Sequence, residues 1–165
     1  MRRPNPSGTS GQYRTMDEIK LSSPEFADGG PIPAVHSHEA GDLSPSLDWT
    51  GVPTSAVELV LTCDDPDAPG GTFTHWMLAG MQPERDGLSA GEDAPRIAKG
   101  RNGFGANGYG GPHPPHGGAP HRYVFTISAL VEPSGLTSGF SPDDLREALR
   151  GKVVATGTLT GTYAR

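Results

Sequence analysis

The sequence predicts a mainly β fold, built from short strands that are joined by turns and loops. The chain has 165 residues, which is long enough for one domain with a hydrophobic core. It contains 24 glycines and 17 prolines, and these residues favour turns over helices. Its apolar residues fall in short runs, and only one segment has the pattern of a helix.

The first strand is expected just after a polar N-terminal tail. No apolar run follows the arginines near the start, so we expect residues 1–16 to form a disordered tail and not an export signal. A single domain then occupies residues 17–165 and begins with a short strand, "DEIKLSS". Further on, Leu47 and Trp49 lie two residues apart and therefore share one face of a second short strand.

Three longer strands follow. The segment 56–63, "AVELVLTC", is nearly continuous in apolar and β-branched residues, which is typical of a central strand. The segment 73–81, "FTHWMLAGM", is the next strand. The segment 122–131, "RYVFTISALV", is the clearest one, because Tyr123 and Val124 begin two alternating sets that face opposite sides of a sheet.

One helix and one strand close the chain. In "SPDDLREALRG", Ser141 is suited to cap the helix, Pro142 to occupy its first turn, and Gly151 to end it. The acidic residues after Pro142 favour the positive end of the helix dipole. The final segment, 152–165, is rich in threonine and predicts one more strand.

Composition excludes several classes of function. The net charge is −6 and no cluster of lysine and arginine is present, so a nucleic-acid partner is not expected. No run of 18 apolar residues occurs, so no membrane span is expected. Cys63 is the single cysteine, which excludes an intramolecular disulfide and fits a cytoplasmic protein.

Chemically active side chains gather at strand ends and in one long loop. The segment "DDPDAPGG" follows the central strand, His75 lies in the next strand, and "GYGGPHPPHGGAPHRYVF" leads into the clearest strand. The segment 82–120 has little periodicity but contains Phe104 and Tyr109, so we expect an ordered functional loop.

These groups suit a small anion pocket. Histidine, tyrosine and glycine-flanked amides are hydrogen-bond donors, and Asp65 or Asp67 could orient a histidine and favour its imidazolium form. Pro114 and Pro115 would shape a wall at little entropic cost.

Each residue also has a purely structural interpretation, which the sequence leaves open. The aspartates could cap a turn, His75 could be a satisfied structural histidine, and His121 could cap a strand. The remaining histidines are expected to be exposed or solvated: His36, His38, His113 and His116.

Taken together in chain order, these motifs resemble the phosphatidylethanolamine-binding protein family, also called Raf-kinase-inhibitor-protein-like. "DPDAP", "HW" and "GYGGPHPPHGGAPHRYVF" carry the resemblance, which is closest to the short bacterial branch. "FADGGPIP", "LSPSLDW" and "ATGTLTGTYAR" extend it from about residue 21 to the C-terminus. The resemblance implies an antiparallel β-sandwich of Greek-key type with one or two peripheral helices.

The resemblance also implies a pocket near the surface and names its residues. Ala68 and Pro69 would form part of the rim, with a cis peptide between them as one option. The Tyr123 hydroxyl would reach the ligand. The ligand-binding residues carried over by motif position are Asp65, Asp67, Ala68, Pro69, Phe73, His75, His113, Pro114, Pro115, His121 and Tyr123.

The sequence departs from the family pattern at two positions. His113 stands where the bacterial branch often has cysteine. Asp64 is an additional acid before the motif, and alternation along the strand predicts that it points away from Asp65. The helices of the branch associated with kinase regulation have no counterpart, so kinase inhibition is not carried over. The bacterial branch also implies a homodimer.

The leading hypothesis is a binding protein for phosphate, a phosphorylated headgroup or a small carboxylate, with no cofactor. The alternative is an enzyme that uses the pocket for acid–base chemistry on a small organic substrate, for example a cyclisation or an isomerisation. Its candidate catalytic residues are Asp65, His75, His113 and His121. Cys63 is not a candidate nucleophile, because it lies in a strand that is expected to be buried.

A third hypothesis is a zinc site. It would use the same carboxylate and imidazoles, Asp65, His75, His113 and His121. These ligand types suit zinc, but their spacing matches no common zinc motif.

Overall fold

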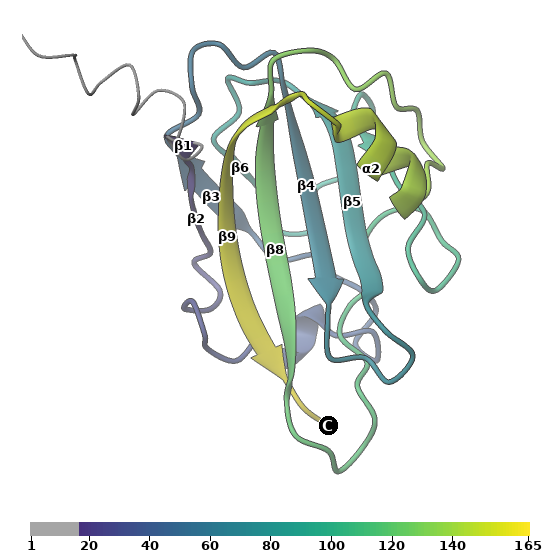
Figure 1. Cartoon of the computed structure of the whole chain (residues 1–165). Helices are drawn as coiled ribbons and strands as arrows, with labels where there is room; N and C mark the ends of the chain where they lie inside the picture. Colours follow the sequence, from purple (N-terminus) through teal and green to yellow (C-terminus); the bar gives the residue numbers. More distant parts are fainter. Residues whose placement is uncertain (1–16) are drawn as a thin grey trace, which may run out of the picture.

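The structure is a computed structural model that describes residues 17–165, and the tail predicted for residues 1–16 lies outside this part. Two β-sheets form the molecule, and Figure 1 looks onto the larger one, with the smaller sheet behind it and α2 in front of β5. In spatial order the larger sheet contains β1 (Asp17–Glu18), β9 (Val153–Tyr163), β8 (His121–Leu130), β4 (Glu58–Asp65), β5 (Phe73–Met81) and β7 (Ala98–Lys99). The smaller sheet contains β2 (Lys20–Ser22), β3 (Leu47–Thr50) and β6 (Gly87–Leu88).

The predicted mainly β fold class is confirmed, and the other predicted strands are present, but "DEIKLSS" is not one strand: β1 joins the larger sheet and β2 the smaller one. Every neighbouring pair of strands is antiparallel except β1 and β9, which run parallel. The loop expected over residues 82–120 proves to be less irregular than its sequence indicates, because it contains β6 and β7. One turn of 3-10 helix, η1 (Ala34–His36), is a further addition.

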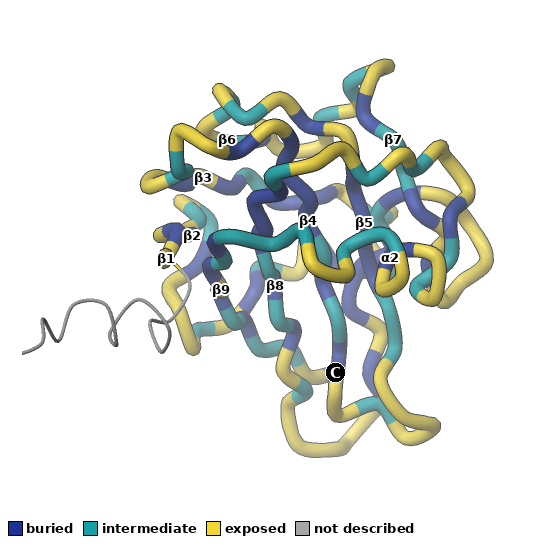
Figure 2. Tube along the Cα trace, turned by 45° about the horizontal axis from the view of Figure 1, so that its top comes forward, coloured by how far each residue is buried: buried dark blue, intermediate teal, exposed yellow. Residues whose placement is uncertain are grey.

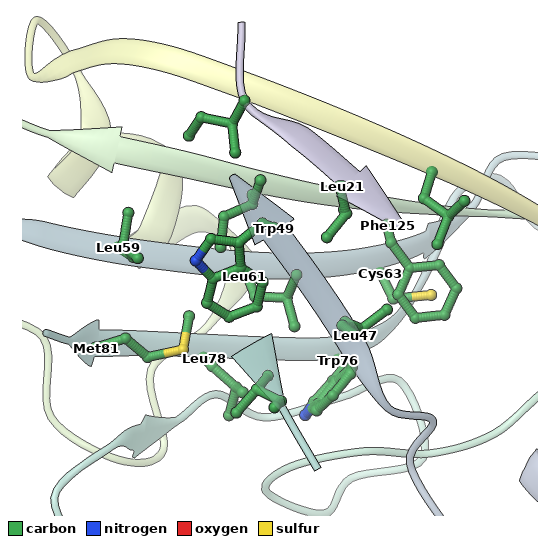
Figure 3. Close-up of a cluster of buried hydrophobic side chains, with 14 of the residues drawn as sticks. Leu21, Leu47, Trp49, Leu59, Leu61, Cys63, Trp76, Leu78, Met81 and Phe125 are labelled. Carbon is green, nitrogen blue, oxygen red and sulfur yellow. The ribbon is translucent and has the colours of Figure 1, made fainter. Parts of the chain in front are cut away.

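The core lies between the two sheets. Leu47 and Trp49 are buried, on the shared face predicted for them, and Figure 3 shows Trp49 over Leu61 and Leu47 beside Trp76 of the larger sheet. In Figure 2 buried stretches run along β3 and β4, while most of the outer turns are exposed. Removing these large apolar side chains from water is the main force that holds the two sheets together.

Ile19, between β1 and β2, lies directly against the backbone of β9. The Ile19 backbone donates a hydrogen bond to Thr156 O at 2.8 Å. A Cβ atom on Gly157 would lie only 1.9 Å from the Ile19 carbonyl oxygen, so only glycine fits at this position.

The helix α2 (Pro142–Leu149) begins as the sequence predicts. Ser141 Oγ accepts a hydrogen bond from Asp144 N at 3.0 Å, and Asp144 Oδ2 accepts one from Ser141 N at 2.9 Å. This capping box fixes the start of the helix, and Gly151, with φ 74°, ends it. Within residues 17–165, no helix is both long and apolar enough to cross a membrane.

Strand directions place the predicted site at one end of the larger sheet. Because β4 runs antiparallel to both β5 and β8, the last residue of β4, Asp65, lies beside the first residues of its neighbours, Phe73 and His121. This is the lower end of the sheet in Figure 1.

Candidate functional site

A cavity of about 230 Å³ opens at this end of the sheet. Its walls come from the ends of β4, β5 and β8 and from the loops beside them. The lining residues are Asp65, Ala68, Pro69, Phe73, His75, Phe104, His113, Pro114, Pro115 and His121.

Most of the residues that the sequence nominated come together around this cavity. Asp67 and Tyr123 are the two nominated residues that do not line it, and Phe104 lines it without having been nominated. A larger groove, of about 470 Å³, lies between α2 and the outer face of the sheet. It contains Asp64, which therefore points away from Asp65, as alternation along the strand predicts.

The Asp65–His121 pair is the best-defined polar contact of the cavity. His121 Nδ1 donates to Asp65 Oδ2 at 2.7 Å, and the Asp65 side chain is almost completely buried. The other carboxylate oxygen, Oδ1, accepts from Asp67 N at 2.8 Å. With Nδ1 engaged in this way, Nε2 is the nitrogen of His121 that can serve a ligand.

His75 is held in a comparable way by the loop. Its Nδ1 lies 2.7 Å from Gly110 O, and since a carbonyl only accepts, Nδ1 carries the hydrogen. Gly110 N donates in turn to His75 O at 2.8 Å. Burial lowers the pKa of His75, although the Gly110 hydrogen bond and the charge of Asp65 oppose this effect. The neutral ring therefore offers a lone pair at Nε2.

Asp67 has a structural role in the turn between β4 and β5. It accepts hydrogen bonds from Arg122 N at 2.9 Å and from Arg122 Nε at 3.0 Å, and its second oxygen lies 2.9 Å from a terminal nitrogen of the same guanidinium. These hydrogen bonds lower the pKa of Asp67 to about 2. The turn is thereby tied to the start of β8, next to His121.

The Tyr123 hydroxyl is buried and has no hydrogen-bond partner within residues 17–165. The ring packs against His75 in a T-shaped arrangement, with centroids 5.1 Å apart, and burial raises the pKa of Tyr123. Tyr123 therefore supports the His75 ring from the core. The peptide bond between Ala68 and Pro69 is trans, which overturns the cis option.

Hydrogen bonds within its loop hold Phe104 in the cavity wall. The buried Asn102 accepts from Phe104 N at 2.9 Å and donates to Gly108 O at 3.0 Å, which fixes the loop on both sides of the ring. A Cβ atom on Gly110 would lie 2.4 Å from the Phe104 ring, and one on Gly103 would lie 2.4 Å from the Phe73 ring. These glycines leave the space that the two aromatic rings occupy.

The other histidines differ in their surroundings. His113 is an exposed residue of the cavity rim, as expected, and its pKa is lowered by partial desolvation and by Arg165 nearby. His38 stacks on Phe104 with centroids 4.0 Å apart and lies 2.8 Å from Asp42 Oδ1 through Nδ1. The expectation that His36 is solvated is wrong: the ring is buried and bonds to Leu43 O at 2.7 Å.

The cavity contains the parts of an acid–base site but no activated nucleophile. Asp65 and His121 form the carboxylate–imidazole pair that such chemistry uses, so acid–base catalysis stays a prediction. Cys63 is buried beneath the sheet, and burial raises the pKa of its thiol. Across residues 17–165, no three histidine, cysteine or acidic side chains converge in a way that could hold a metal ion, so the zinc hypothesis finds no ligand set there.

Relatives of known sequence and structure share this whole domain. Residues 22–164 match the family model described as "Phosphatidylethanolamine-binding protein". A UPF0098 protein of Aquifex aeolicus is 40% identical over 154 residues, which span 89% of each chain.

Two solved structures have the same fold. A phosphatidylethanolamine-binding protein homologue of Chlamydia trachomatis superposes with a TM-score of 0.84 at 34% identity, over 90% of this chain and 99% of the other. E. coli YbcL, described as a member of the mammalian PEBP family, gives a TM-score of 0.83 at 31% identity, over 89% and 98% of the two chains. The chain described here therefore belongs to the phosphatidylethanolamine-binding protein family.

Proposed function

We propose that this protein binds a small anion, namely phosphate, a phosphorylated headgroup or a carboxylate, in the cavity formed by β4, β5, β8 and the adjoining loops. One observation carries the proposal: two imidazoles, His75 and His121, line the same cavity, and each has its Nδ1 engaged by the protein. In both rings Nε2 is thus left for a ligand, and a protonated Nε2 is a good donor to an anionic oxygen.

The charges around the cavity predict that anion binding is coupled to the uptake of a proton by the protein. The negative charge of Asp65 stands beside His121, and the lowered pKa of His75 keeps that ring neutral in the free protein. A bound anion favours the charged form of His75. Binding is therefore expected to take up a proton at His75, whose Nε2 then donates to the ligand.

The family supports the same ligand chemistry. The name of the family refers to phosphatidylethanolamine, a lipid whose headgroup contains a phosphodiester, and the Chlamydia trachomatis relative is described as a homologue of such a protein. The family name therefore supports a phosphate group as the charged part of the ligand.

Thermal unfolding with and without phosphate or phosphoethanolamine at pH 6.5 tests the proposal. Ligand at about 100 times its Kd stabilises a folded protein by about 2.7 kcal/mol, which raises the melting temperature of a domain of this size by about 5–10 °C. We expect this increase in the wild type and its loss in His75→Gln. His116→Gln is the matched control, because His116 is an exposed histidine of the same loop and does not line the cavity.

Two results would count against the proposal. One is a wild-type protein that binds neither compound. The other is an equal increase in melting temperature for the wild type and both variants, which would place the anion outside this cavity.

A further inference from the structure

We propose that the cavity contains an apolar subsite formed around Phe104 and Phe73, and that its ligand is an anion with an apolar, ring-sized group attached directly to the phosphate or carboxylate. This inference rests on the proposed anion-binding function and specifies which class of anion the cavity takes.

The lining of the cavity is too apolar for an inorganic anion alone. Four residues with ionisable side chains line it, and the other six are apolar: Ala68, Pro69, Phe73, Phe104, Pro114 and Pro115. Anionic oxygens that face such walls lose hydrogen bonds to water and gain none, which is costly. An apolar substituent that faces them instead is favourable, because it leaves water together with the wall.

The size of the cavity points the same way. A volume of about 230 Å³ corresponds to seven or eight water molecules at roughly 30 Å³ each. A phosphate ion, with one phosphorus and four oxygen atoms, fills only part of this space. The remainder is bounded by the aromatic and proline side chains and suits a further group of the ligand.

Phe104 is presented to solvent in a fixed orientation. Its side chain is among the exposed large hydrophobic ones, at 37% exposure, yet His38 stacks on it almost in parallel, with an interplanar angle of 3°. Asn102 holds its backbone, and Gly110 lies close to the ring. A ligand that covers this ring gains apolar contact without the entropic cost of ordering it.

The apolar wall adjoins the polar groups directly. The Phe73 ring centroid lies 4.7 Å from that of His75 and 4.9 Å from that of Phe104. The ring centroids of Phe104 and His75 lie 5.8 Å apart. If His75 holds the phosphate or carboxylate, the ligand atom attached to that group lies against these rings. The apolar group must therefore be attached without a long polar linker.

Isothermal titration calorimetry at pH 6.5 with inorganic phosphate, methyl phosphate and phenyl phosphate tests the inference. Methyl phosphate shares the monoester charge of phenyl phosphate and lacks the ring. We expect phenyl phosphate to bind the wild type at least about tenfold more tightly than methyl phosphate, a factor that corresponds to about 1.4 kcal/mol. Methyl phosphate and inorganic phosphate should bind with similar affinity.

Three variants assign the effect to Phe104. Phe104→Ala should still bind inorganic phosphate but should lose most of the preference for phenyl phosphate over methyl phosphate. Phe104→Leu should keep part of this preference, because leucine restores apolar contact without the ring. Val57→Ala is the matched control: Val57 is 47% exposed, immediately precedes β4 and lies at the end of that strand away from Asp65, so the preference should be unchanged.

Each contrary outcome has a separate meaning. If phosphate binds but phenyl phosphate binds no more tightly, the apolar subsite is wrong and the anion site stands. If phenyl phosphate keeps its full advantage in Phe104→Ala, the subsite is also wrong. If none of the three compounds binds the folded wild type, both the subsite and the anion function are overturned.

Discussion

At the scale of single residues, His75 links the fold to the proposed chemistry. Its Nδ1 fixes the loop through Gly110, and its ring packs between Tyr123 and Phe73. The same burial that fixes the ring lowers its pKa, so that the free protein holds a neutral imidazole at the cavity. A structural histidine and a ligand-binding histidine are therefore compatible interpretations of this residue, because they use different ring nitrogens.

The lowered pKa of His75 predicts that anion affinity rises as the pH falls. Sulfate is a suitable probe, because its charge is constant between pH 5.5 and pH 8. A bound anion raises the pKa of His75, so binding takes up a proton and the affinity rises by up to about tenfold per pH unit within this range. Calorimetric titrations at several pH values measure the slope. His75→Gln should flatten it and His116→Gln should not; equal slopes in all three proteins would exclude His75 as the linked group.

The same lowered pKa has the opposite effect on the free protein. A histidine whose pKa is lower when folded than when unfolded stabilises the fold above the unfolded value of about 6.5. This contribution is lost as the pH falls through the folded pKa, since the ring must then be protonated in a buried place. Acid thus destabilises the free protein at the residue where it strengthens anion binding.

The sequence nominated most of the cavity wall; of the nominated residues only Asp67 and Tyr123 do not line it, and Phe104 lines it without having been nominated. The resemblance of the motifs to the family nominated these residues, and the strand order of the sheet brings the ends of β4, β5 and β8 together. The motifs could not show that Asp67 turns away to Arg122, because side chains in a tight turn lack the alternation of a strand. Phe104 lies in a loop without periodicity, and its partners are distant in sequence. Tyr123 lies on the core face, as predicted, and does not line the cavity.

At the scale of elements, a buried carboxylate fastens the segment that precedes α2. Glu58, the first residue of β4, accepts hydrogen bonds from Ser134 N at 2.9 Å and from Ser134 Oγ at 2.7 Å. It also accepts from Gly80 N at 2.8 Å. One side chain thereby joins the connection after β8 to β4 and β5.

Glu58→Gln is expected to destabilise the protein by about 1–3 kcal/mol, the usual cost of leaving a buried hydrogen-bonding group unsatisfied. The amide group that replaces one carboxylate oxygen is a donor, so it faces donors from the backbone or from Ser134. Urea denaturation followed by circular dichroism measures the loss. Glu132→Gln is the control, because Glu132 is an exposed acid in the same connection, and a loss no larger than that of the control would contradict the assigned role.

The elements that sequence patterns missed are the shortest ones. β6 and β7 have two residues each, which is too few to show an alternating pattern, and they form because β3 and β5 offer free edges. The capping box of α2 and the nearly continuous apolar strand β4 were predicted because their signals are local. Glu58 was not identified, because a single acid in such a strand does not reveal its distant partner.

At the scale of the whole molecule, the two sheets enclose one common core. Trp49 belongs to the smaller sheet and Trp76 to the larger one, and both are buried in the same cluster of apolar side chains. The smaller sheet has only short strands, and its apolar side chains share one buried cluster with those of the larger sheet. The homodimer and the cytoplasmic location stay predictions, since both concern surroundings beyond a single chain.

The shared core predicts that both sheets unfold in a single cooperative transition, as expected of one domain. The chain has two tryptophans, so Trp49→Phe leaves a reporter in the larger sheet and Trp76→Phe leaves one in the smaller sheet. Each substitution removes core volume and lowers the midpoint. The comparison is therefore made within each variant, between tryptophan fluorescence and far-ultraviolet circular dichroism during urea denaturation.

We expect the two signals to coincide in both variants, because a three-stranded sheet with such short strands cannot keep its apolar face buried once the larger sheet is lost. In Trp76→Phe, a fluorescence change that precedes the circular dichroism change would show the smaller sheet detaching first. The cavity depends on this cooperativity. Its walls include strand ends of the larger sheet, and that sheet is held in place by packing against Leu47 and Trp49, so early loss of the smaller sheet would disorder the proposed anion site before the protein unfolds.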